Sequence, residues 1–239
     1  MKKVNLTIKI LAIISTLLTV EFTEVSAQKF RHNQIWLDLT STFKLTNTLK
    51  SNVEIGYRVE PSEKLNQTYF RSMLFYTPQK YIKMSLWVAQ YNSRRPEGSA
   101  IELRTSEFLY VSWPSIQGFK FVHRFGLDQR MFYTSGYDLS KYVHRSRYRF
   151  GLHSPYFSLF KSKPSYYVKV SFEVLKNINQ QDAAIWVDHD WLSLNLGYSV
   201  NKKLSLEAHI LLIHGFNPIT QDFEGEISVM RLRLKFKFL

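Results

Sequence analysis

The stretch Met230–Phe238, MRLRLKFKF, places an apolar side chain at every second position and an arginine or lysine at each position between. A β-strand sends successive side chains to opposite faces, so this segment has one apolar and one strongly basic face. An α-helix, with its period of about 3.6 residues, would mix the two kinds of side chain on every side. The segment is therefore predicted to be a strand that separates an apolar environment from a polar one.

The same alternation recurs along most of the chain. In the segment 49–60, for example, Val53, Ile55 and Tyr57 share one parity, while Glu54 and Arg58 share the other. We expect eleven strands, at about 34–45, 49–60, 68–77, 81–93, 101–113, 119–133, 142–153, 165–175, 184–200, 203–214 and 226–239. There is no linker or change of composition between them, so we expect one domain.

The first 27 residues have the form of a secretory signal peptide. Lys2 and Lys3 precede an apolar run at about 10–20, and Val25-Ser26-Ala27 has the small-x-small pattern of a cleavage site. The run is too short for a transmembrane helix. We therefore expect a leader at 1–27 and an exported domain at 28–239.

Two architectures can hold such strands. A soluble β-sandwich buries its apolar faces between two sheets, whereas a membrane barrel turns them toward lipid and keeps a polar interior. The expected strands are long for a globular protein, and aromatic residues such as Tyr76, Tyr81 and Trp113 gather at strand ends, as at membrane interfaces. Short connections, as near 46–48, are expected to alternate with longer polar ones, as near 94–100.

The sequence thus predicts an all-β, antiparallel, up-and-down transmembrane barrel in the outer membrane of a Gram-negative bacterium. Single-chain bacterial barrels have even strand numbers, so we expect twelve strands, with ten as the next choice. A soluble periplasmic β-sandwich that binds a ligand is the structural alternative. Expected partners are outer-membrane lipid and lipopolysaccharide, and the barrel-insertion machinery, which reads an alternating final strand; here Phe238 is penultimate.

Composition limits the chemistry. The 239 residues include no cysteine, which excludes disulfide scaffolds, thiolate metal sites and cysteine nucleophiles. Lys and Arg outnumber Asp and Glu by 32 to 19, a formal net charge of +13. The leader and the spread of charge along strand faces argue against a nucleic-acid partner. We expect no cofactor and no metal site.

Several stretches resemble an outer-membrane barrel family known as domain of unknown function 2490. The matching residues are Trp36, Glu54 with Arg58, His123–Arg130 (HRFGLDQR), Arg145–Arg149 (RSRYR) and Leu196–Asn201 (LGYSVN). The resemblance implies a barrel in the outer membrane and implies no particular activity.

The most distinctive candidate site is a set of charged residues on the polar strand faces. It comprises Glu54, Arg58, Glu102, Arg124, Asp128, Arg130, Arg145, Arg147, Arg149, Glu173, Arg231 and Arg233. These residues are expected to face the lumen, either as a bracing network of ion pairs or as a basic lining that favours anions. The sequence favours a non-enzymatic protein, structural or a narrow channel.

An enzymatic alternative rests on one pair. His144 and Ser146 lie two residues apart on the expected lipid face, as in outer-membrane lipid hydrolases that attack acyl esters with a base-activated serine. No third residue that would orient His144 is identifiable.

Overall fold

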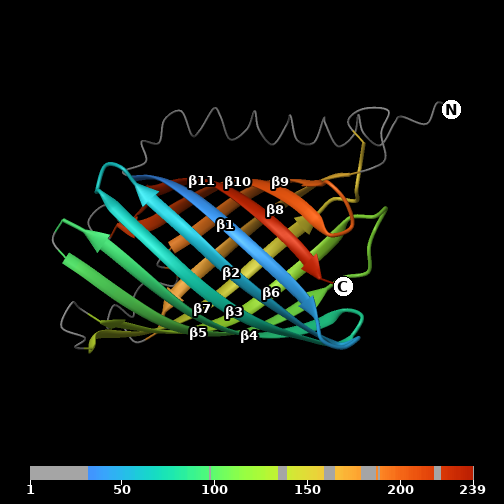
Figure 1. Ribbon diagram of the computed structural model, residues 1–239, viewed down its shortest axis with the longest axis horizontal. Coiled ribbons are helices and arrows are strands. Elements are labelled where there is room, and N and C mark those ends of the chain that lie inside the picture. The colour runs from blue at the N-terminus through green and yellow to red at the C-terminus, as the bar shows by residue number, and fades with distance from the viewer. Residues whose placement is uncertain are drawn as a thin grey trace.

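The protein, seen here as a computed structural model, forms one closed β-barrel (Figure 1). The structure describes residues 32–96, 98–133, 139–158, 165–178, 187, 189–217 and 222–238. The expected leader at 1–27 lies outside the described residues. No helix in the described part of the chain is long and apolar enough to cross a membrane.

The sequence alternation predicts the strands well. They are β1 (His32–Lys44), β2 (Leu49–Glu60), β3 (Leu65–Gln79), β4 (Ile82–Arg95), β5 (Gly98–Ser112), β6 (Lys120–Tyr133), β7 (Leu139–His153), β8 (Tyr166–Asn177), β9 (His189–Ser199), β10 (Leu204–Asn217) and β11 (Asp222–Phe238). Sequential strands pair antiparallel around the barrel.

The closure of the barrel corrects the expected strand number and direction. It closes with eleven strands, and β1 pairs with β11 in parallel, from His32 opposite Ile227 to Phe43 opposite Phe238. In an up-and-down chain with an odd number of strands, the first and last run the same way, so the seam between them must be parallel. Twelve strands are not confirmed, and an antiparallel seam is wrong. Figure 1 shows the blue β1 beside the red β11.

The two ends of the barrel are here called the N-rim, where β1 begins, and the C-rim, where β1 and β11 end. The expected alternation of short and long connections does not hold. Connections 61–64 and 96–97 at the N-rim are as short as 45–48 and 80–81 at the C-rim, and the long connections 178–188 and 154–165 lie at opposite rims. Most strands, such as β3 and β11, are longer than expected and take up residues that the sequence assigned to loops, whereas β9 is shorter than the expected 184–200.

The parity of each strand sets an apolar outer wall and a charged inner wall. The outward Leu86, Leu127 and Leu232 are 49 %, 50 % and 51 % exposed, whereas the inward Asp128 and Glu173 are 1 % exposed. A sandwich would show the reverse, with leucines enclosed and carboxylates in water. The closed barrel therefore does not favour the β-sandwich alternative.

Three inward glycines make room for aromatic rings of the neighbouring strand. The pairs are Gly56 with Tyr69, Gly126 with Phe108, and Gly197 with Tyr167, and the partners stand directly opposite each other in register. A Cβ at any of the three glycines would lie under 3.0 Å from ring atoms. Each ring covers the backbone of its glycine and so replaces the missing side chain.

Aromatic side chains also surround the C-rim. Tyr76, Trp113 and Tyr156 are 48 %, 54 % and 52 % exposed there. At the seam, Phe43 stacks on Phe238 with ring centroids 5.0 Å apart. The penultimate position of Phe238 thus places its ring on β1, where it closes the barrel.

Candidate functional site

The barrel encloses a cavity of about 470 Å³ that is lined from every strand except β8. Among the described residues that line it, eleven are arginines and one, Glu102, carries a carboxylate. The charged residues singled out in the sequence lie on this inner wall, and their contacts explain how so many arginines are accommodated.

Glu173 on β8 is the centre of the first group of ion pairs. Its carboxylate accepts hydrogen bonds from Arg124 at 2.5 Å, from Arg147 at 2.7 Å and from Arg149 at 2.5 Å. Arg124 lies on β6, and Arg147 and Arg149 lie on β7. Arg149 stands directly opposite Glu173 in register, and Arg124 stands opposite Arg149. One acid therefore joins three strands.

Asp128 and Glu102 extend the same network. Asp128 accepts from Arg145 at 2.6 Å and from Arg147 at 3.2 Å, so Arg147 bridges Asp128 and Glu173. Glu102 accepts from Arg130 at 2.7 Å and from Arg104 at 2.6 Å. Buried charges are costly unless they are paired in this way.

A second group of ion pairs lies at the parallel seam. Arg231 donates to Asp38, and Arg233 lies 3.4 Å from the same carboxylate, which it faces directly in register. Glu54 accepts from Arg71 at 2.9 Å and is reached by Arg231 at 3.4 Å. These contacts link β11 to β1, β2 and β3, so they stabilise the closure.

A third group is formed by lysines near the C-rim. Glu207 on β10 accepts from Lys169 at 2.8 Å, from Lys235 at 3.2 Å and from the Tyr167 hydroxyl at 2.7 Å. Lys83 faces the lumen over the ring of Tyr110, with 4.0 Å from its Nζ to the ring centroid. We refer to all three groups together as the arginine–carboxylate lattice.

The lattice gives the cavity a positive surface even though most of its charges are paired. Asp128, Glu173 and Glu207 are 1 %, 1 % and 2 % exposed, because their short side chains stay against the wall. The longer arginine side chains reach past them and form the lining. In the described residues, the ion pairs run along the wall between nearby strands and none joins opposite sides of the barrel. The geometry suits attraction of anions.

Sequence reasoning missed Asp38, Arg71, Arg104 and Glu207. Parity could have found several of them, since Asp38 lies between Leu37 and Leu39, Glu207 lies between Leu206 and Ala208, and Arg104 shares the parity of Glu102. What parity could not give is the partner of each acid, because pairing depends on which strands become neighbours and in what register.

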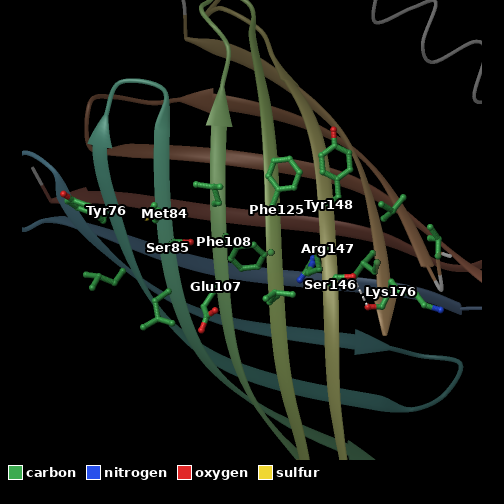
Figure 2. Close-up of a pocket in the computed structure, with 18 residues that line it drawn as sticks. Tyr76, Met84, Ser85, Glu107, Phe108, Phe125, Ser146, Arg147, Tyr148 and Lys176 are labelled. Carbon is green, nitrogen blue, oxygen red and sulfur yellow. Dashed lines mark hydrogen bonds between the residues drawn. The ribbon is translucent and has the colours of Figure 1, made fainter. Parts of the chain in front are cut away.

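The His144–Ser146 pair lies on the outer wall. Ser146 borders a shallow groove of about 900 Å³ that crosses β3 to β8 and is lined mainly by apolar side chains such as Leu74 and Met84 (Figure 2). Its hydroxyl donates to the backbone carbonyl of Lys176 at 3.4 Å, and the ring of His144 packs edge-on against Tyr142. This arrangement does not favour a serine hydrolase.

One group in the described residues has a donor set that could hold a metal ion. The ligand atoms of His32, Glu60 and Glu63 lie within 4.8 Å of one another at the N-rim. His32 Nδ1 is 2.6 Å from Glu60, which also accepts from Gln34 at 2.7 Å. These protein contacts account for the positions of His32 and Glu60.

Comparisons with known proteins identify a family. A family model described as protein of unknown function (DUF2490) matches residues 33–224. A search of curated proteins found no match. Among solved structures, an anion-selective porin from Comamonas acidovorans is similar, with 13 % sequence identity and a TM-score of 0.31; the alignment covers 77 % of this chain and 55 % of the porin. The chain thus spans little more than half of that porin's length.

Proposed function

The chain belongs to the DUF2490 family of proteins of unknown function, and we propose that it is an integral outer-membrane β-barrel whose arginine-lined lumen admits small anions. The observation that carries the proposal is the division of the wall: leucines face outward, and the cavity within is lined, in the described part of the chain, by eleven arginines and one glutamate. Because lipid cannot satisfy a free strand edge, a closed sheet is also what a bilayer requires.

The location in the outer membrane of a Gram-negative bacterium is part of the proposal. The secretory form of residues 1–27, the exposed aromatics at the C-rim and the alternating β11 support it. In this setting the outer wall contacts lipid and lipopolysaccharide, and the insertion machinery acts on β11. Fractionation with a heat-modifiable gel shift tests the location; release of the protein by osmotic shock would contradict it.

The lumen is proposed to act without catalysis, as a narrow anion pathway. In a low-dielectric wall, unneutralised guanidinium edges lower the energy of an anion and raise that of a cation. The lattice also braces the barrel, so a purely structural role is the second candidate.

Planar bilayers separate the two candidates. The refolded full-length chain is placed in a potassium chloride gradient, and the reversal potential gives the selectivity. We expect small chloride-selective currents. Cation-selective currents would overturn the proposal. Insertion without any current would overturn the anion pathway, and only the structural role would remain.

A further inference from the structure

The cavity has a second kind of wall that anion conduction does not explain. On β9, β10, β11 and β1, toward the N-rim, inward positions carry apolar side chains in place of charged ones. Together they form one packed cluster, made of Trp36, Leu211, Ile213, Val229, Trp191 and Ile227. All but Val229 border the cavity. Membrane barrels usually keep a polar interior, so this patch inside the lumen calls for an explanation.

Arg58 stands at the edge of the apolar cluster. Its guanidinium lies over the Trp36 indole, 3.9 Å from the ring centroid, and near the rings of Tyr69 and Tyr91 at 4.8 and 5.2 Å. One nitrogen donates to Gln67 at 3.1 Å, and the buried Nε has no hydrogen-bond partner in the structure described here.

Arg58 differs from the lattice arginines because no carboxylate neutralises it. Within the described ranges, Arg58 forms no ion pair, whereas Arg71 pairs with Glu54 and Arg104 with Glu102. Aromatic faces stabilise its charge instead. The Trp36 ring that supports Arg58 is itself held in place, because the Trp36 indole donates to Gln34 at 2.7 Å and Gln34 donates to Glu60 at 2.7 Å.

We infer that the cavity binds an amphipathic monoanion, an aliphatic carboxylate, with its acid group on Arg58 and its chain along the apolar cluster beside Trp36. A small inorganic anion would use the guanidinium alone and leave the apolar wall in contact with water. A carboxylate with an acyl chain uses both features at once. The cavity volume of about 470 Å³ is in the range of small-molecule sites. The inference deepens the proposed function and rests on it only in placing anions in the lumen.

The test is a series of straight-chain acids of increasing length. The full chain is refolded in lipid nanodiscs and titrated with butanoate, hexanoate and octanoate, with tryptophan fluorescence as the readout, since Trp36 and Trp191 border the cavity. Each methylene buried against the cluster should tighten binding roughly fourfold, so octanoate should bind roughly 200-fold more tightly than butanoate. Octylammonium is the cationic control and should not bind.

Two matched pairs of variants locate the site. Arg58→Gln should weaken all three acids at least about tenfold, whereas Arg94→Gln, at an exposed position of the N-rim, should not. Leu211→Ala should weaken octanoate more than butanoate, whereas its neighbour Leu212 faces outward and Leu212→Ala should have no effect.

Several results would overturn the inference. They are affinity that does not change with chain length, equal binding of octylammonium, and binding that Arg58→Gln leaves intact. Because the titration needs no current, its outcome is independent of the bilayer experiment. Chloride-selective currents together with a flat chain-length series would remove this inference and leave the proposed function standing.

Discussion

Replacing Glu173 by glutamine would remove one charge from the centre of the arginine–carboxylate lattice while keeping the shape of the side chain. Glu173 is 1 % exposed and holds Arg124, Arg147 and Arg149 at 2.5–2.9 Å. After the change, three guanidinium groups face a neutral amide whose own N–H groups are donors. Arg147 keeps Asp128 as a partner, but Arg124 and Arg149 lose the only carboxylate that they contact in the described residues.

The expected loss in free energy of unfolding is about 3–5 kcal/mol, the typical cost of breaking a buried ion pair by removing one partner. This corresponds to a shift of roughly a hundred- to several-thousand-fold in the folding equilibrium. Urea unfolding of the vesicle-embedded barrel, followed by tryptophan fluorescence and heat-modifiable migration, measures it. The matched control is Glu107→Gln on the exposed outer wall, where the described residues offer no ion pair. This change should cause no loss in the free energy of unfolding.

A double variant distinguishes charge imbalance from lost packing. The side chain of Arg149 is 34 % exposed, against 6 % and 7 % for Arg124 and Arg147, so it is the least costly arginine to neutralise. Glu173→Gln combined with Arg149→Gln should therefore recover part of the stability. If Glu173→Gln costs less than about 1 kcal/mol, or if the double variant is no more stable than the single one, the reasoning about the lattice is wrong.

Other parts of the structure lead to further expectations. Gly126→Ala should destabilise the barrel by about 1–3 kcal/mol in the same urea assay, because its Cβ would overlap an aromatic ring, while Gly151→Ala, whose nearest contact would be 3.6 Å, should be nearly neutral. Equal effects would argue against the glycine–ring pairs. Phe238→Ala should slow formation of the heat-modifiable form and cost about 0.5–1.5 kcal/mol, since it loses a ring stack at the seam; wild-type folding kinetics would contradict this. Ser146→Ala should leave any ester hydrolysis measured in detergent unchanged, and a loss of rate would revive the hydrolase alternative.

Alternation in the sequence determined much of this fold because a strand has a period of two, and that period can be read without knowing any neighbour. Arg231 and Leu232 show the principle: one faces the lumen and the other faces outward, as their parity requires. Parity also placed the charged set on the inner wall. The same local logic could have added Asp38 and Glu207.

The tertiary structure alone decided how the barrel closes and which charges meet. The contact between Asp38 and Arg231 joins residues at opposite ends of the chain, across a parallel seam that an even-strand assumption excludes. The absence of an acid beside Arg58 in the described residues, and the apolar cluster next to it, depend likewise on register between strands far apart in sequence. A local pattern fixes the face on which a side chain lies, whereas its partner across the wall depends on closure of the whole sheet, which only long-range pairing determines.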